Sequence, residues 1–163
     1  EFMPSTKVVV FRSGQEEYAV PVEKVVSIEK FEKVNRIPHM PDYVLGLIKV
    51  RNELLPILDF EQILYNRKAN SSDAKIIILQ TEDFVYGLLV LEAKEILDIE
   101  EDKLKQIGLV NYAKTQYFSA VANLENRMIT IVSPDVLVNT LDGIKELKEY
   151  MNSLTEEELQ AMV

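Results

Sequence analysis

A repeated pattern of short apolar runs constrains the fold of this chain more than any other feature. The run at 18–22 (Tyr-Ala-Val-Pro-Val) lines up with the run at 86–90 (Tyr-Gly-Leu-Leu-Val), and each is followed by a charged stretch. Two later hairpins also match in length and composition, one over 47–58 and one over 121–132. Because pattern and order agree, the sequence predicts two similar small β units in one chain.

The turns and caps around these hairpins repeat as well. Asparagine lies at each turn, as at Asn52, and tolerates the left-handed conformation that a tight turn requires. Each hairpin leads into a short predicted helix, the first capped by Asp59 and running through Leu64, the second opened by Pro134. A polar break at 66–73 separates the two halves.

The fold class predicted from these runs is mainly β. A unit of about five short strands is too small to enclose a large core alone, so we expect the two units to share one. The expected strands fall at 8–11, 18–22, 25–31, 44–50, 54–58, 75–79, 85–91, 96–99, 118–124 and 128–132.

Composition excludes several functions. The chain has 163 residues with 18 basic and 27 acidic side chains, a net charge of −9, which argues against binding nucleic acid or a polybasic membrane anchor. It has no Cys and one His, so disulfides, thiolate sites and zinc sites built from several His are excluded. No apolar run approaches the roughly 20 residues of a membrane helix, and we expect a cytoplasmic protein without direct membrane insertion.

No residue pattern in the sequence indicates catalysis. His39 lies between two prolines and is interpreted as a surface or packing residue. The carboxylate clusters at 16–17, 100–102 and 156–158 lie in turns or on a polar helix, where solvation explains them. No glycine-rich phosphate loop occurs among five glycines. We therefore expect no enzyme, no catalytic residues, no metal and no cofactor.

Two features indicate binding surfaces instead. The run 25–28 is apolar on both faces and is a candidate edge strand. Arg51 ends an apolar run at a turn, where it either anchors a partner's carboxylate or bonds backbone carbonyls across the turn, and both interpretations stay open.

The C-terminal segment 142–163 differs from the rest. It holds six acidic and two basic residues and so carries −4 of the total charge. Apolar residues at helical spacing, such as Ile144 and Leu147, predict a helix, and Thr155 with Glu158 resembles a second helix start. A solvated amphipathic helix packed on the β units is favoured over a partner-binding tail.

The sequence also resembles a known family. The opening Val9-Val10-Phe11, Gly14 and the run 17–25 (Glu-Tyr-Ala-Val-Pro-Val-Glu-Lys-Val) resemble the start of the CheW chemotaxis coupling-protein family. The stretches 44–51 (Val-Leu-Gly-Leu-Ile-Lys-Val-Arg) and 55–59 (Leu-Pro-Ile-Leu-Asp) resemble its central motifs. The resemblance covers about residues 8–141 in the family's order.

This resemblance implies two five-stranded SH3-like β-barrels packed side by side and no enzymatic activity. It implies an adaptor in signal transduction that joins the cytoplasmic tip of methyl-accepting chemoreceptors to the regulatory domain of the histidine kinase CheA. The positions that match the family's receptor contacts are Val25, Gly46, Arg51 and Gly87. The positions expected to contact the kinase are Ser27 and Glu29 on one barrel, and Lys105 and Val110 on the other.

The expected organisation combines this resemblance with the residue patterns described above. Residues 1–7 form a tag-derived or disordered N-terminus, 8–141 the CheW-like domain and 142–163 an acidic helical extension. The first barrel spans about 8–65, completed by C-terminal elements, and the second about 75–133.

Departures from the family's pattern leave other interpretations open. Asn52 replaces a glycine, Leu91 replaces an aspartate, Ala120 replaces a glycine, and Ser27 stands where an acidic residue is usual. There are two alternatives to the chemotaxis adaptor. The chain could be a CheW-like module of a CheV-like or twitching-type system, or a small-ligand-binding regulatory domain.

Overall fold

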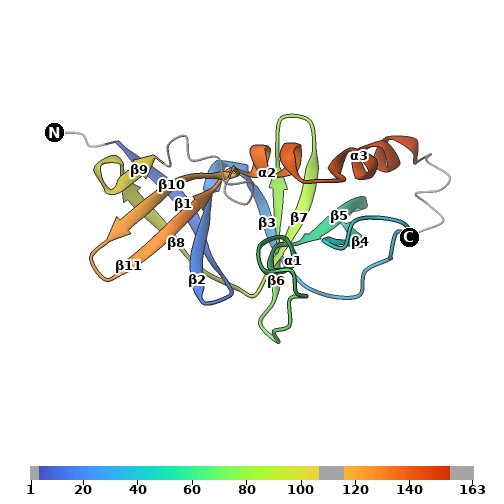
Figure 1. Cartoon of the computed structure of the whole chain (residues 1–163), viewed down its shortest axis with the longest axis horizontal. Helices are drawn as coiled ribbons and strands as arrows, with labels where there is room; N and C mark the ends of the chain where they lie inside the picture. Colours follow the sequence, from blue (N-terminus) through green and yellow to red (C-terminus); the bar gives the residue numbers. More distant parts are fainter. Residues whose placement is uncertain (1–3, 107–115, 155–163) are drawn as a thin grey trace.

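The computed structural model describes residues 4–106 and 116–154. Its strands form two sheets that lie side by side along the long axis of the molecule, with short helices beside them (Figure 1). The first sheet has six strands in the order β8-β1-β2-β11-β10-β9, and the second has five in the order β3-β6-β7-β5-β4. The predicted mainly β class is confirmed, but one sheet has six strands rather than five, because the three-residue β9 joins it.

The strands and helices have the following bounds. The six-stranded sheet contains β1 (Ser5–Ser13), β2 (Glu16–Pro21), β8 (Glu92–Glu100), β9 (Leu104–Gln106), β10 (Phe118–Leu124) and β11 (Arg127–Val132). The five-stranded sheet contains β3 (Val25–Lys30), β4 (Val44–Val50), β5 (Glu53–Asp59), β6 (Lys75–Gln80) and β7 (Val85–Val90). The helices are α1 (Phe60–Tyr65), α2 (Pro134–Thr140) and α3 (Ile144–Ser153), with single 3-10 turns η1 (Val22–Lys24) and η2 (Glu101–Lys103).

The internal repeat is visible in the strand pairing. In the five-stranded sheet β5 runs parallel to β7, with Ile57 opposite Gly87. In the six-stranded sheet β11 runs parallel to β2, with Ile131 opposite Ala19. These are the residue pairs that the sequence alignment of the two halves makes equivalent, so both halves use one pairing scheme.

The two halves exchange their opening hairpins. The β1–β2 hairpin of the first half pairs with β8 and β11 of the second, while β6 and β7 of the second half pair with β3 and β5 of the first. The order of the strands along the chain suggested that one sheet ends and the other begins at residues 65–75. The observed pairing shows instead that each sheet contains strands from both sides of this segment. In addition, β1 begins at Ser5, inside the segment 1–7 expected to be unstructured.

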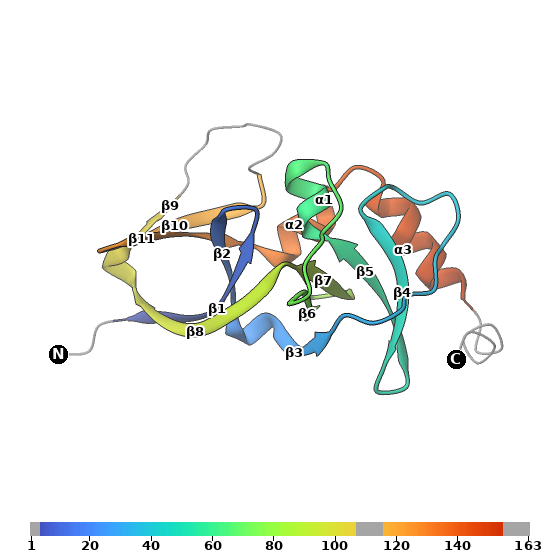
Figure 2. The ribbon, with the colours of Figure 1, turned by 90° about the horizontal axis from the view of Figure 1, so that it is seen from below.

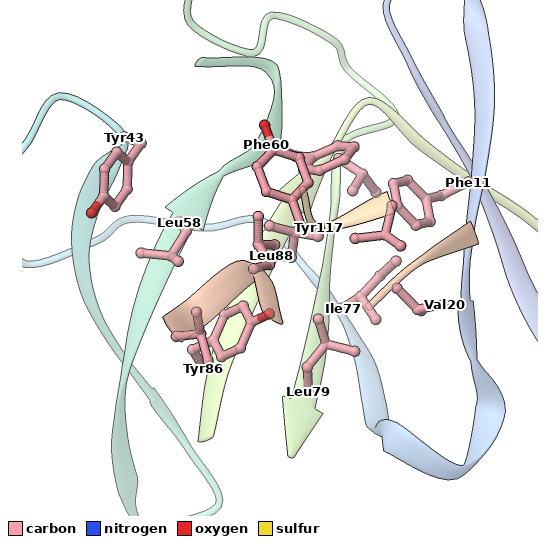
Figure 3. Close-up of a cluster of buried hydrophobic side chains, with 14 of the residues drawn as sticks. Phe11, Val20, Tyr43, Leu58, Phe60, Ile77, Leu79, Tyr86, Leu88 and Tyr117 are labelled. Atoms are coloured by element: carbon pink, nitrogen blue, oxygen red, sulfur yellow. The ribbon is translucent and has the colours of Figure 1, made fainter. Parts of the chain in front are cut away.

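The largest hydrophobic core lies between the two sheets (Figure 3). Phe11 and Tyr18 from the six-stranded sheet meet Phe60, which follows β5, with ring centroids 5.4 and 5.3 Å from that of Phe60. Leu137 of α2 and Leu147 of α3 are fully buried in the same cluster. Each sheet also has a smaller cluster of its own. The expectation that two small units share a core is thus confirmed.

The predicted helices form where the caps placed them. The Asp59 carboxylate accepts hydrogen bonds from the backbone N–H groups of Glu61 and Gln62 at the start of α1. Proline at 134 opens α2, with Ser133 as its N-cap. The helix predicted around Ile144 and Leu147 is α3; the second helix start, at 155–158, lies outside the described residues.

A polar bridge centred on Glu61 also connects the two sheets. Its side chain is 4 % exposed, and its carboxylate accepts hydrogen bonds from Ser13 Oγ (2.7 Å) and Gly14 N–H (2.8 Å) at the β1–β2 turn. Arg67 Nε donates to the other oxygen at 2.7 Å. Burial alone would raise the pKa of Glu61, but the hydrogen bonds from Ser13, Arg67 and Gly14 bring it below its usual 4.5.

We expect Glu61→Gln to lower the free energy of unfolding by about 1–3 kcal/mol, because one buried oxygen becomes an amide that cannot accept. Since the folded pKa of Glu61 is lowered, its stabilisation is present above pH 4.5 and is lost as the pH falls through the folded value. Urea unfolding from neutral to acidic pH should therefore show a smaller loss of stability for the variant than for the wild type. Glu100→Gln, at an exposed position of β8, is the control and should change neither quantity; equal acid sensitivity of Glu61→Gln and wild type would contradict the bridge.

Candidate functional site: an exposed strand edge and a cationic groove

Strand β3 is an edge strand with apolar side chains in solvent. It pairs with β6 on one side and with no other strand of the described residues. Val26 and Ile28 are 48 % and 43 % exposed, and Phe31 just beyond the strand is 41 % exposed. The candidate edge at 25–28 is therefore confirmed. Exposed apolar groups on an unpaired edge are typical of a protein interaction surface.

A groove of about 540 Å³ lies beside this edge, between the end of β3, the segment after it and the end of β4. We call it the cationic groove. It is lined by Glu29, Lys30, Glu32, Lys33, Asn35, Ile48, Lys49, Val50 and Arg51. The groove brings together Glu29, predicted to contact the kinase, and Arg51, predicted to contact the receptor.

Arg51 owes its exposure to the turn between β4 and β5. Arg51 and Asn52 both have left-handed backbone conformations, with φ of 50° and 69°. Two consecutive residues with positive φ match the tight turn that joins twisted antiparallel strands. The left-handed conformation predicted for Asn52 is confirmed, and Arg51 at this turn lines the groove. Within the described residues Arg51 makes neither an ion pair nor a hydrogen bond to a carbonyl.

Val25 and Ser27 lie at a register shift of β3 against β6. Val25 is half-buried and packs against the central core, while Ser27 Oγ is buried without a hydrogen-bond partner in the described part of the chain. These two positions therefore connect the exposed edge to the interior. Their predicted roles, receptor contact for Val25 and kinase contact for Ser27, stay predictions.

Close packing accounts for glycine at Gly46 and Gly87. Gly46 is buried with a φ of 144°, and a Cβ there would collide with the backbone carbonyl oxygen of Asn35. Gly87 is buried in β7, where a Cβ would lie 2.5 Å from Ile57 Cδ1 and from Ile76 Cγ2. The family resemblance placed both glycines at a receptor contact and gave no sign that they are interior.

The other predicted kinase contacts lie far along the molecule. Lys105 is exposed on β9, the edge strand of the six-stranded sheet opposite β8. Val110 lies outside the described residues. Among the described residues, the predicted kinase contacts thus belong to edges of two different sheets.

Sequence reasoning missed three lysines of the cationic groove. Lys30, Lys33 and Lys49 are exposed and, with Arg51, give the groove four cations against the two carboxylates of Glu29 and Glu32. The sequence does contain one signal for this groove, because Lys30 and Lys33 follow shortly after the apolar run at 25–28. Lys49 lies on β4, 16 residues after Lys33 in the sequence. Only the structure shows that it lines the same groove as Lys30 and Lys33.

The sole His does not build a catalytic site. His39 is exposed, has a φ of 62° and lines a groove of about 590 Å³ with Arg36 and Asp42. Asp59 also lines this groove, but its oxygens accept three backbone N–H groups, from Glu61, Gln62 and Ala69. No group of three or more metal-binding side chains occurs in the described residues.

Two packed sheets with an exposed apolar edge and a charged groove define a protein-binding module. The family described as "CheW-like domain" matches residues 7–142. The chain is 27 % identical over 141 residues to chemotaxis protein CheW of Bacillus subtilis (strain 168), covering 85 % of this chain and 90 % of the relative. It is 30 % identical over 131 residues to chemotaxis protein CheW of Rhizobium meliloti (strain 1021), covering 79 % and 84 %.

A solved structure agrees with these relatives. The crystal structure of the scaffolding protein TtCheW from Thermoanaerobacter tengcongensis superimposes with a TM-score of 0.77 and 26 % identity, over 86 % of this chain and 96 % of that chain. This chain therefore belongs to the CheW family of chemotaxis proteins and is a non-enzymatic scaffolding and coupling protein. No helix among the described residues is long and apolar enough to cross a membrane.

We expect Gly87→Ala to lower the free energy of unfolding by about 1–3 kcal/mol, because the added methyl group overpacks the core between Ile57 and Ile76. Urea unfolding measures this cost. Ile96→Ala, at a side chain 60 % exposed on β8, is the control and should stay within about 0.5 kcal/mol of wild type. A Gly87→Ala variant with wild-type stability and impaired receptor binding would show instead that Gly87 acts by direct contact.

Proposed function

We propose that this chain couples the cytoplasmic tip of methyl-accepting chemoreceptors to the histidine kinase CheA, and that it works in the cytoplasm, recruited to membrane receptor arrays through these partners. The observation that carries the proposal is the exposed edge of β3 with Val26 and Ile28 beside the cationic groove. An adaptor needs two separate surfaces. The five-stranded sheet offers this edge and the surface around Arg51, and the six-stranded sheet offers a further edge at β9.

The receptor is assigned to the surface around Arg51 and Val25. Arg51 projects from a defined turn and has no ion-pair partner in the described residues, so its guanidinium is available to a partner's carboxylate. Val25 connects this surface to the central core. Gly46 and Gly87 support it from inside by letting the strands and the Asn35 segment approach closely.

The kinase regulatory domain is assigned to the strand edge. Ser27 and Glu29 lie on β3, whose outer backbone groups are free of strand pairing in the described part of the fold. Edge-to-edge contact with a domain of similar architecture would cover Val26 and Ile28 and complete the sheet. A second contact at β9, near Lys105 and Val110, would extend the assembly from the other sheet.

Arg51→Ala should weaken binding to the receptor about tenfold, since it removes a bidentate cation from an otherwise intact surface. Folding should be nearly unchanged, because Arg51 is exposed and alanine carries the same Cβ into the turn. Co-sedimentation with receptor-containing membranes measures the binding, and Lys7→Ala on β1 is the matched control. Unchanged binding by Arg51→Ala would remove Arg51 from the receptor surface.

Glu29→Lys should weaken binding to CheA about tenfold, through reversed charge at the β3 edge. The readouts are titration of purified CheA and activation of the kinase in receptor membranes. Glu100→Lys, a matched charge reversal at an exposed position of the other sheet, should leave both unchanged. If wild-type protein neither co-sediments with receptor and CheA nor alters kinase activity, the coupling function itself is wrong.

A further inference from the structure

The cationic groove lies between the two end strands of the five-stranded sheet. The strand order β3-β6-β7-β5-β4 leaves β3 and β4 at the ends of this sheet. Both strands line the groove, β3 with Glu29 and Lys30 and β4 with Ile48, Lys49 and Val50. The groove is therefore an open seam between the first and the last strand of one sheet.

One backbone contact already closes part of this seam. Asn35, which follows β3, pairs with Leu47 of β4: the Asn35 N–H donates to the Leu47 carbonyl at 2.8 Å, and the Leu47 N–H donates to the Asn35 carbonyl at 2.7 Å. Figure 2 shows this segment passing beside β4, with the end of the β4–β5 hairpin extending beyond the crossing. The outer edge of β4 thus accepts an antiparallel partner, and in the described residues it does so at Leu47.

Lys49 is the next residue of β4 whose backbone faces the seam. In an antiparallel strand the N–H and C=O groups of every second residue point to the same side, so those of Lys49 point the same way as those of Leu47. On the opposite side of β4, Leu47 faces Pro56, which has no N–H to donate. No backbone hydrogen bond joins Lys49 to a residue across the seam in the described part of the chain. The described residues therefore leave one donor and one acceptor at Lys49 for a strand from outside.

The other half of the internal repeat shows the same edge covered by a strand. The hairpin at 47–58 aligns with the hairpin at 121–132, so β4 corresponds to β10. In the six-stranded sheet β9 pairs with the outer edge of β10 at three positions. In the five-stranded sheet the single pair of Asn35 and Leu47 stands in place of this ladder. Within the described residues, β4 thus lacks the covering strand that its counterpart has.

The side chains along the seam favour a partner strand with an alternating pattern. Ile48 and Val50 pack against the apolar cluster of the five-stranded sheet, whereas Lys49 is exposed on the opposite face of β4. Side chains directly opposite each other on paired strands lie on the same face. A partner strand therefore needs apolar residues opposite Ile48 and Val50, and an acidic residue opposite Lys49. The charge of the groove favours the same sign, since its four cations exceed its two carboxylates.

We propose that the cationic groove binds an extended segment of a partner protein in which apolar and acidic residues alternate. The segment lies antiparallel along β4, between the Asn35 contact and the β4–β5 turn, and exchanges a pair of backbone hydrogen bonds with Lys49. Its acidic side chains face the cations of the groove, and its apolar side chains cover Ile48 and Val50. This interaction goes beyond the coupling function proposed above.

NMR titration of the full chain with the acetylated and amidated peptide Glu-Val-Glu-Val-Glu tests the site. At saturation we expect solvent exchange of the Lys49 amide to slow at least tenfold, because a partner strand accepts its hydrogen bond. The same peptide with an N-methyl group on its central glutamate keeps every side chain but loses the donor that pairs with Lys49. It should bind at least tenfold more weakly. The block peptide Val-Val-Glu-Glu-Glu has the same composition without the alternation and should also bind at least tenfold more weakly.

Two variants separate the backbone contact from the side-chain charge. Lys49→Ala removes the charge but keeps the N–H, and should weaken peptide binding about threefold. Lys49→Pro also removes the N–H, at an edge position where proline is tolerated, and should weaken binding at least tenfold. Lys7→Ala, at an exposed position of β1 in the other sheet, is the matched control and should bind like wild type.

The peptide measurements decide the inference even if Lys49→Pro fails to fold. Equal binding of the N-methylated or the block peptide, or an unchanged exchange rate of the Lys49 amide, overturns it. Self-association of the chain that Lys49→Pro abolishes would assign the seam to a second copy and would also overturn it. Since the titration contains neither receptor nor kinase, its failure leaves the coupling function standing, and failure of co-sedimentation leaves the peptide site standing.

Discussion

The aromatic and aliphatic core between the two sheets is the interaction on which the rest of this structure depends. Neither sheet buries much by itself: the clusters inside them are small, while the cluster between them includes Phe11, Phe60 and Tyr86 at no measurable exposure. Burial is favourable in proportion to the apolar area removed from water, so the two sheets are stable only together. For an adaptor this has a direct consequence, because surfaces on different sheets keep a fixed relative position.

The exchange of hairpins links the two sheets through the path of the chain, in addition to the hydrophobic core between them. Since β1 and β2 complete a sheet otherwise built from the second half, each sheet contains strands from both halves of the chain. Hydrophobic contacts in the core do not depend on direction, but hydrogen bonds do. The bonds that the Glu61 carboxylate accepts from Ser13 and Gly14 require one orientation of α1 against the β1–β2 turn. Hydrophobic contacts stabilise the packing of the two sheets, and this buried carboxylate restricts their relative orientation.

Local rules predicted the local elements of this fold. Asp59 and Pro134 mark helix starts through capping, and Asn52 marks a turn through its tolerance of positive φ, so each acts within a few residues. The pairing of β1 with β8 could not be predicted in that way, because strands 80 or more residues apart are joined by backbone hydrogen bonds that carry no side-chain signature. Glu61 was equally hidden, since a glutamate in a first helical turn is usually solvated and its partners are distant in sequence.

The candidate site shows the same limit at finer scale. The apolar edge at 25–28 was predictable, because a short run that is apolar on both faces is typical of an edge strand that meets a partner, and Val26 and Ile28 are the exposed apolar side chains. Gly87 looked like a point of close approach for a partner, yet the close approach is made by Ile57 and Ile76 of neighbouring strands. Glycine in a strand indicates that something lies near the backbone without saying what. In a strand buried on both faces, as β7 is, that neighbour belongs to the protein's own core, so the partner surface that we propose consists of the edge of β3 and Arg51 at its turn.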